Sequence, residues 1–205
     1  MTRTATIFVI DDQESVRHSL GEMLGVFGFA VETFASADDF LATLEPGRIG
    51  VIVADVKMPG TDGIALVREL ARRAIRLPVV LISGHADVAM AVAAIKAGAD
   101  DFIEKPIDDT ALVAAINRAL ARTFEEFAAQ RAKESLAVRF GRLTPRQVEI
   151  FDLVVEGYTS HAIAAKLAIS TRTVESYRAE IMDKMEAESV AVLVRQAIRL
   201  GRLAP

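Results

Sequence analysis

The first 121 residues alternate short apolar runs with segments in which apolar residues recur every three or four positions. The segment Val16, Leu20, Met23 and Leu24 shows this second spacing, which is typical of an amphipathic helix. The apolar runs are rich in β-branched residues and predict five strands, at 6–10, 30–34, 51–54, 79–82 and 101–103. Strands that alternate with helices indicate an α/β domain with a parallel sheet, covered by helices on both faces.

The last third of the chain has a different pattern. A helical pattern begins at Asp108, and residues 121–139 stay rich in Ala, Glu, Arg and Gln without Gly or Pro, which predicts a helical linker. Gly141 ends it, and Thr144-Pro145-Arg146-Gln147 has the form of a helix start with a capping box. An all-α domain of four short helices follows, at 145–156, 160–167, 171–185 and 189–200. We therefore expect domains at 1–121 and 142–205, joined by a helical linker at 122–141.

Composition narrows the function. The 205 residues are 52% hydrophobic and 25% charged, which is typical of a globular protein. The absence of cysteine excludes disulfides, thiolate zinc sites, iron–sulfur clusters and a cysteine nucleophile. With no run of 18 apolar residues and no signal peptide, we expect a cytoplasmic protein that does not contact a membrane.

Charge differs between the two parts of the chain. Residues 1–121 hold 11 Lys and Arg against 17 Asp and Glu, a balance of −6, whereas residues 122–205 hold 13 against 11, a balance of +2. The overall charge of −4 therefore hides a mildly basic second domain. Nucleic-acid binding by that domain stays open on charge alone.

Polar residues follow four of the five predicted strands. Asp11 and Asp12 follow the first strand, Asp55 the third, Ser83 the fourth and Lys105 the fifth. In a parallel sheet these positions lie at one edge, where ligands bind. Three carboxylates that meet there need a cation, and oxygen ligands favour Mg²⁺.

This set of residue types suits phosphoryl transfer. Asp55 can attack a phosphoryl group while Mg²⁺, Lys105 and the hydroxyl of Ser83 hold the transferred oxygens. Any one of these residues alone is more often a solvated loop residue, but their joint placement favours the phosphoryl site. Glycine-rich phosphate loops are missing from the sequence, which argues against nucleotide binding.

The motifs of the first domain resemble the receiver domain of two-component response regulators over residues 5–121. They are Asp11-Asp12, Asp55 with Met58-Pro59-Gly60, Ser83-Gly84-His85 and Phe102-Ile103-Glu104-Lys105-Pro106. The resemblance implies a flavodoxin-like (βα)5 fold in which Asp55 accepts a phosphoryl group from a sensor histidine kinase. It implies a Mg²⁺ site formed by the side chains of Asp11, Asp12 and Asp55 and the backbone carbonyl of Lys57.

Two positions implied to act as the switch depart from the commoner receiver residues. Ser83 shifts towards the phosphoryl group and Phe102 follows it, by resemblance. Threonine is commoner than serine at the first position, and phenylalanine lacks the hydroxyl of a tyrosine at the second. The resemblance therefore implies a switch that works through packing.

The second domain is similar to the LuxR/NarL helix-turn-helix output domain over residues 141–202. The similar segments are Leu143-Thr144-Pro145-Arg146, Ile163-Ala164 and 170–175, and Ala168-Ile169-Ser170 has the place of the turn. The resemblance implies that the third of the four predicted helices enters the major groove of promoter DNA. Its candidate DNA-binding residues are Thr171, Arg172, Thr173, Glu175, Ser176, Arg178, Ala179 and Lys184.

Among these DNA-binding candidates, the residues at the helix start would contact phosphates, and those from Glu175 to Ala179 would read base edges. His161, where a basic residue is frequent, and Glu175, an anion in a groove of phosphates, depart from the pattern. The exposed face can also be merely solvated, so which bases are read stays open.

In length and order the whole chain resembles the FixJ subfamily of response regulators. The resemblance implies a transcription factor that dimerises when phosphorylated, works with RNA polymerase and activates its genes. Nitrogen fixation is the implied pathway if the chain is FixJ itself, but regulators of other pathways share these motifs. The dimer face implied by resemblance contains Val88, Val92, Lys96 and Asp100.

Two other functions stay open at this point. A Mg²⁺-dependent phosphohydrolase would use Asp55 as nucleophile, but it needs a second carboxylate two residues later, where Lys57 stands. A phospho-dependent adaptor that binds protein instead of DNA has only the weak +2 balance of the second domain in its favour. We expect a regulator and not an enzyme.

Overall fold

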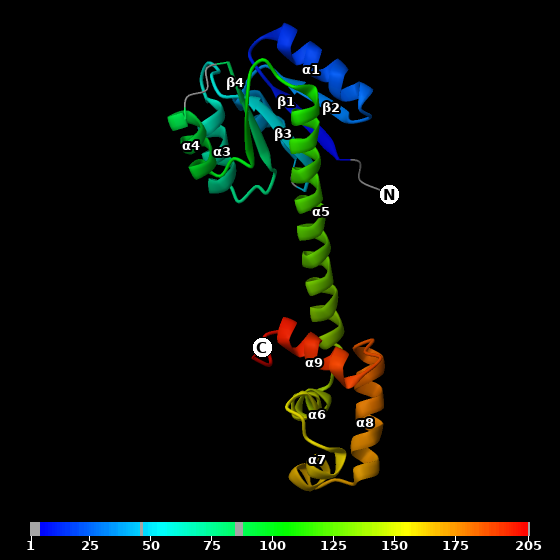
Figure 1. Ribbon diagram of the computed structural model, residues 1–205. Coiled ribbons are helices and arrows are strands. Elements are labelled where there is room, and N and C mark those ends of the chain that lie inside the picture. Colours follow the sequence, from blue (N-terminus) through cyan, green and yellow to red (C-terminus); the bar gives the residue numbers. More distant parts are fainter. Residues whose placement is uncertain (1–4, 46, 85–87, 205) are drawn as a thin grey trace. The chain divides into compact units, whose positions relative to one another are not determined.

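The computed structural model describes residues 5–45, 47–84 and 88–204 (Figure 1). The chain splits into two compact units, Met1–Glu125 and Glu126–Pro205, and each is described by itself. The motif residue His85 lies outside the described residues, as do Ala86 and Asp87.

The first unit is built on one parallel sheet. Across the described residues the sheet has five strands in the order β2-β1-β3-β4-β5. The strands are β1 (Thr6–Ile10), β2 (Ala30–Phe34), β3 (Gly50–Asp55), β4 (Val79–Ser83) and β5 (Asp101–Glu104). The predicted (βα)5 fold is confirmed, and the last three strands run slightly further than predicted because their polar terminal residues still pair with a neighbouring strand.

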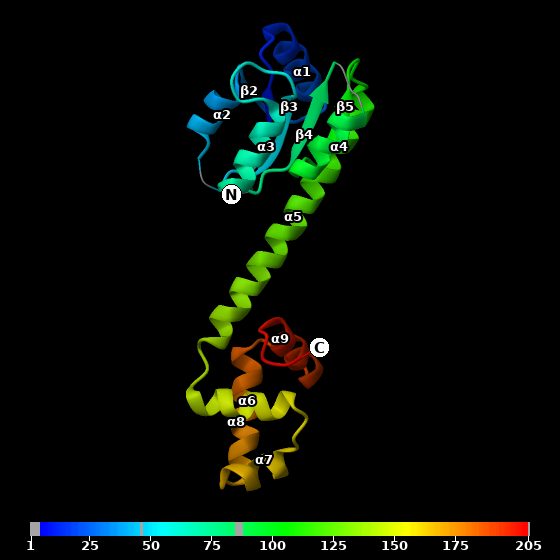
Figure 2. The same cartoon turned by 90° about the vertical axis from the view of Figure 1, so that its left-hand side faces the viewer.

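Helices cover both faces of the sheet, and alternate residues of β1 show which helices cover which face. Ile7 and Val9 pack with α1 and α5, whereas Phe8 and Ile10 pack with α2, α3 and α4. The helices are α1 (Glu14–Val26), α2 (Ala37–Thr43), α3 (Gly63–Arg72), α4 (Val88–Ala97) and α5 (Asp109–Phe140). Figure 2 looks onto the side of α3 and α4, with α1 behind the sheet. Since both faces are covered, the strands can be apolar throughout, and residues 51–54 are buried.

The second unit contains α6 (Pro145–Val155), α7 (Ser160–Leu167), α8 (Thr171–Lys184) and α9 (Val190–Arg199). Each begins after a hydroxyl residue whose side chain accepts from a backbone N–H of the first turn. The predicted capping box at Thr144 and Gln147 is present. Figure 2 shows α6 crossing α8, and their apolar stripes form one core with α7 and α9.

Helix α5 runs without a break through the predicted linker and ends at Phe140, just before Gly141. Its last turn packs in the second unit: Leu136 is 3% exposed, and the ring of Phe140 meets that of Phe151 edge-on at 5.3 Å between centroids. The guanidinium of Arg202 lies over the ring of Phe140, 5.0 Å from the ring centroid. The packed core of the second unit therefore takes in the end of the predicted linker, because these apolar side chains find their partners there.

Candidate functional site

Three polar side chains are buried where strands of the sheet end. Asp11 directly follows β1 and is 2% exposed, while Asp55 and Ser83 are the last residues of β3 and β4 and are 7% and 1% exposed. Burial of two carboxylates this close to the end of a hydrophobic strand is costly unless each is paired and hydrogen-bonded. Their partners therefore define the site.

Lys105 supplies the balancing charge. Its Nζ donates to Oδ1 of Asp55 at 2.7 Å and to Oδ2 of Asp11 at 3.1 Å. Partial burial lowers the pKa of Lys105, but the hydrogen bonds and charges of Asp55 and Asp11 outweigh it, so the pKa lies above its usual value. One ammonium thus bridges the ends of two strands.

Backbone N–H groups bind the remaining carboxylate oxygens. The N–H of Gln13 donates to Oδ1 of Asp11 at 2.9 Å, and the N–H of Lys57 donates to Oδ2 of Asp55 at 2.7 Å. A Cβ on Gly63, the first residue of α3, would lie 2.5 Å from the carbonyl oxygen of Asp55, so only glycine lets α3 begin against this strand end. The N–H of Lys57 and the close approach of Gly63 therefore help to fix the position of Asp55.

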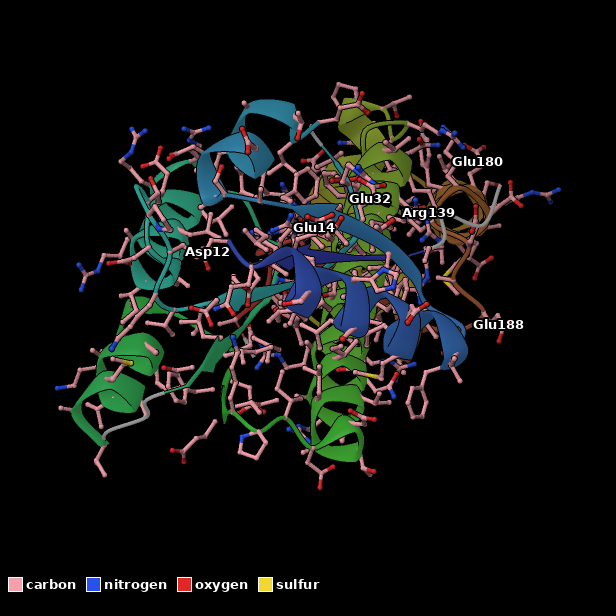
Figure 3. All side chains as sticks on the ribbon, turned by 90° about the horizontal axis from the view of Figure 1, so that it is seen from above. Asp12, Glu14, Glu32, Arg139, Glu180 and Glu188 are labelled. Atoms are coloured by element: carbon pink, nitrogen blue, oxygen red, sulfur yellow. The ribbon has the colours of Figure 1, made fainter. Side chains whose placement is uncertain are left out.

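The third predicted acid differs from the other two. Asp12, labelled in Figure 3, is exposed. Arg17 of α1 donates to the backbone carbonyls of Asp11 at 2.7 Å and Asp12 at 3.0 Å and so fixes the turn that carries both acids. In the described part of the chain, no three acidic or histidine side chains gather as a metal site would need. The structure thus brings Asp11 and Asp55 together around the ammonium of Lys105, whereas the side chain of Asp12 is exposed to solvent.

These residues nevertheless fit a small divalent cation. Oxygens of Asp11 and Asp55 already reach a single positive group, at 3.1 and 2.7 Å from Nζ of Lys105. Carboxylate oxygens are the ligands that Mg²⁺ takes in proteins, and it usually keeps several waters as well. A net excess of one negative charge remains on the two acids after Lys105 is counted.

The predicted switch residues lie on two neighbouring strands, with Ser83 at the end of β4 and Phe102 in β5. The hydroxyl of Ser83 donates to Sδ of Met90 at 3.6 Å, which joins the end of β4 to the first turns of α4. Phe102 of β5 is partly buried and packs against the same core cluster as Met90. The sequence patterns did not single out Met90, because a methionine on an apolar helix carries no distinguishing signal.

The predicted dimer face is partly as expected. Val88 and Val92 of α4 are 82% and 45% exposed, and Ile95, which was not predicted, is 51% exposed beside them. Lys96 is exposed, but Asp100 accepts from the backbone N–H of Val79 at 2.8 Å and pairs with Arg122. The apolar centre is therefore present at the surface, whereas the carboxylate of Asp100 is committed within its own chain.

The predicted DNA-binding residues lie along α8. Ser170 caps the helix by accepting from the backbone N–H of Thr173 at 3.0 Å. Most of the candidates are exposed, and the more covered ones are Thr171, Arg178 and Lys184. Lys184 is set apart, because its Nζ donates to Oε1 of Gln147 at 2.7 Å and to the carbonyl of Arg142 at 3.3 Å. The sequence alone does not show whether Lys184 is exposed to solvent or hydrogen-bonded within its own domain.

Each of the two units matches a known protein family. Residues 7–117 match the response regulator receiver domain, and residues 142–197 match the bacterial regulatory proteins of the luxR family. The chain is 41% identical over 201 residues to the transcriptional regulatory protein FixJ of Azorhizobium caulinodans, covering 98% of this chain and 95% of that protein. No helix among the described residues has both the length and the apolar character that crossing a membrane requires.

Solved structures point the same way. The response regulator StyR superposes with a TM-score of 0.86 at 37% identity, covering 96% of this chain and 99% of that one. Full-length FixJ from B. japonicum gives a TM-score of 0.62 at 39% identity, covering 98% and 100%. The chain therefore belongs to the two-component response regulators, as a FixJ-like transcriptional regulator with a receiver domain and a LuxR-type DNA-binding domain.

Proposed function

We propose that Asp55 is the residue on which this regulator accepts a phosphoryl group from a sensor histidine kinase. The observation that carries the proposal is the contact of 2.7 Å between Oδ1 of Asp55 and Nζ of Lys105, beside the buried carboxylate of Asp11. An ammonium at this place can hold a phosphoryl oxygen as soon as the aspartate carries the phosphoryl group. Asp55 is thus buried, and it lies beside a cation, Lys105, that can stabilise the transferred phosphoryl group.

In the proposed transfer, an oxygen of Asp55 forms a bond to phosphorus while the bond from phosphorus to the kinase histidine nitrogen breaks. Asp11, Asp12, Asp55 and the backbone carbonyl of Lys57 would hold Mg²⁺, which supplies neutralisation of the phosphoryl oxygens. The ammonium of Lys105 moves from Asp55 towards the transferred phosphoryl group. The N–H of Lys57 continues to donate to the carboxyl oxygen of Asp55 that does not bind phosphorus. The products are the aspartyl phosphate and the free kinase histidine.

The proposed switch couples this site to the surface of α4. The hydroxyl of Ser83 turns from the sulfur of Met90 to a phosphoryl oxygen, and Phe102 packs into the space that it leaves. Because Met90 belongs to α4, the change reaches the exposed side chains of Val88 and Val92. A second copy of the phosphorylated chain then packs on this apolar face.

In the output domain, we infer that α8 enters the major groove of promoter DNA. Thr171, Arg172 and Thr173 at its start contact phosphates, and the exposed residues of the next turns, among them Glu175 and Ala179, face base edges. The phosphorylated dimer then recruits RNA polymerase and activates transcription. The genes controlled, in nitrogen fixation or another pathway, follow from the operator sequence.

Salt-dependent DNA binding separates this function from its rivals. The chain should bind a duplex enriched from random-sequence DNA, with an affinity that falls steeply as salt rises, since phosphate contacts release counterions. A phosphohydrolase would instead release inorganic phosphate from excess phosphodonor over many turnovers, and an adaptor would bind no DNA at any salt concentration. Multiple turnovers with no salt-dependent DNA binding would contradict the proposal.

The proposed dimer face makes a specific prediction. Val92→Asp should leave phosphorylation intact but weaken phosphate-induced dimerisation at least about tenfold, because two carboxylates would be buried opposite each other across the two-fold axis. Sedimentation with and without a phosphodonor measures it. Val26→Asp is the matched control, since Val26 is 87% exposed on α1, away from this face. Dimers as abundant in Val92→Asp as in the control would place the interface elsewhere.

A further inference from the structure

Gln147 stands at the centre of a polar cluster in the second unit. It lies in the first turn of α6 and is 2% exposed. Its Oε1 accepts from the backbone N–H of Thr144 at 3.0 Å and from Nζ of Lys184 at 2.7 Å, while its Nε2 donates to Oε2 of Glu180 at 2.7 Å. One buried amide therefore serves the start of α6 and two charged residues of α8.

The neighbours determine which way the amide of Gln147 points. Its oxygen faces two donors, and its nitrogen faces a carboxylate acceptor. A turned amide would set N–H groups against an ammonium and a backbone N–H, and would set its oxygen against the carboxylate of Glu180. A carboxylate at position 147 would satisfy Lys184 and Thr144 equally well, but it would repel Glu180. Only an amide suits all three partners.

This cluster ties α8 to α6 at two successive turns. Glu180 and Lys184 are four residues apart on α8, so they project from the same side of the helix. Lys184 also donates to the carbonyl of Arg142, two residues before Thr144, which caps the start of α6. Two fixed points one turn apart set both the rotation of α8 about its axis and its distance from α6.

The same cluster controls where the carboxylate of Glu180 lies. Glu180, labelled in Figure 3, lines a surface groove together with Arg172, Thr173 and Ser176, which are three of the candidate DNA-binding residues. The hydrogen bond from Gln147 holds its charge on α6, at the side of this groove. Without that bond the carboxylate is free to turn towards the residues that contact phosphates, where a negative charge weakens DNA binding.

We propose that Gln147 is a positioning residue for DNA recognition: it sets the rotation of α8 and keeps the carboxylate of Glu180 away from the DNA. The proposal rests on the proposed function, in which α8 enters the major groove. Gln147 itself touches no DNA and acts through α8.

Exchange of the two groups tests this role in the full-length chain. Gln147→Glu should weaken binding to a duplex enriched from random-sequence DNA by about tenfold, because Glu180 is repelled into the groove. The double variant Gln147→Glu with Glu180→Gln should bind within about twofold of the parent. In it the new amide at position 180 donates to the new carboxylate at position 147, which still accepts from Lys184 and Thr144.

The single variant Glu180→Gln is the matched control and should bind DNA at least as well as the parent, because it loses a negative charge and keeps a hydrogen bond. Parent affinity in Gln147→Glu, or no recovery in the double variant, would overturn the proposal. If Gln147→Glu does not fold, recovery of fold and DNA binding in the double variant decides in its favour. Arg172→Ala, measured in the same assay, tests α8 itself: unchanged binding there would contradict the proposed function, whereas weakened binding there together with parent affinity in Gln147→Glu would overturn the role of Gln147 alone.

Discussion

Replacement of Asp55 by Asn is expected to abolish acid-labile phosphate incorporation from a small phosphodonor such as acetyl phosphate. The amide has no nucleophilic oxygen of carboxylate strength, and it removes one of the two negative charges that face Lys105. We expect a fall in the rate of at least about a thousandfold, since the nucleophile itself is lost. Radiolabel retained on the chain after gel separation measures the result.

The substitution also has a structural cost that can be measured separately. One oxygen of Asp55 accepts from Lys105 and the other from the backbone N–H of Lys57, so either orientation of an amide sets its NH₂ group against a donor. This should lower the free energy of unfolding by about 1 to 3 kcal/mol. Denaturant unfolding must therefore show that the variant is folded before its inactivity is interpreted.

Asp12→Ala is the matched control in this experiment. It keeps the acceptor and its ion pair with Lys105, and it removes an exposed side chain that we assign to the Mg²⁺ site. Phosphate incorporation in this variant should no longer respond to Mg²⁺ concentration. Phosphorylation that persists in Asp55→Asn, with the label on another residue, would contradict the assignment of the acceptor.

The second large effect concerns the end of α5. A fragment that starts at residue 141 should be largely unfolded, whereas a fragment of residues 126–205 should fold. The shorter fragment lacks Leu136 and Phe140, whose burial in the core we value at about 4 to 8 kcal/mol together. It also lacks Arg139, which donates to the carbonyl of Met185 at the end of α8. A domain of this size has roughly 3 to 10 kcal/mol of stability, so the loss is comparable with the whole.

Urea unfolding followed by far-ultraviolet circular dichroism measures this difference. A fragment of residues 134–205 is the control, because it removes residues 126–133 of α5 and keeps the packed last turn. Its unfolding midpoint should equal that of residues 126–205. Cooperative unfolding of the fragment from 141 at the same midpoint would show that the last turn of α5 contributes nothing to the core.

Much of the fold could be predicted from the sequence because its signals are local. The β-branched runs, the Thr144 capping box and the lack of Gly or Pro before Gly141 each act within a few residues. The packing of Leu136 and Phe140 could not be predicted in this way. Their apolar side chains fit an ordinary helical pattern, and only the tertiary structure shows which core they join.

The same distinction between local and tertiary signals applies to the candidate site. The positions of Asp11, Asp55, Ser83 and Lys105 followed from topology, since parallel strands bring their carboxyl ends to one edge. Partners between distant side chains gave no local signal, and Lys184 is the clearest case. The sequence predicted that Lys184 belongs to the DNA-binding face of α8, whereas in the structure it donates to Gln147. Asp100 was expected on the dimer face, and in the structure it pairs with Arg122 of the same chain.

If Asp55 is the acceptor, its phosphorylation should control DNA binding by the output domain. The most direct test measures the affinity of the full-length chain for its enriched duplex, with and without acetyl phosphate and Mg²⁺, beside Asp55→Asn under the same conditions. We predict that the phosphodonor tightens binding by the parent at least about tenfold and leaves the variant unchanged. A parent that binds equally well in both conditions, or a variant that responds as the parent does, would contradict control of DNA binding by phosphorylation of Asp55.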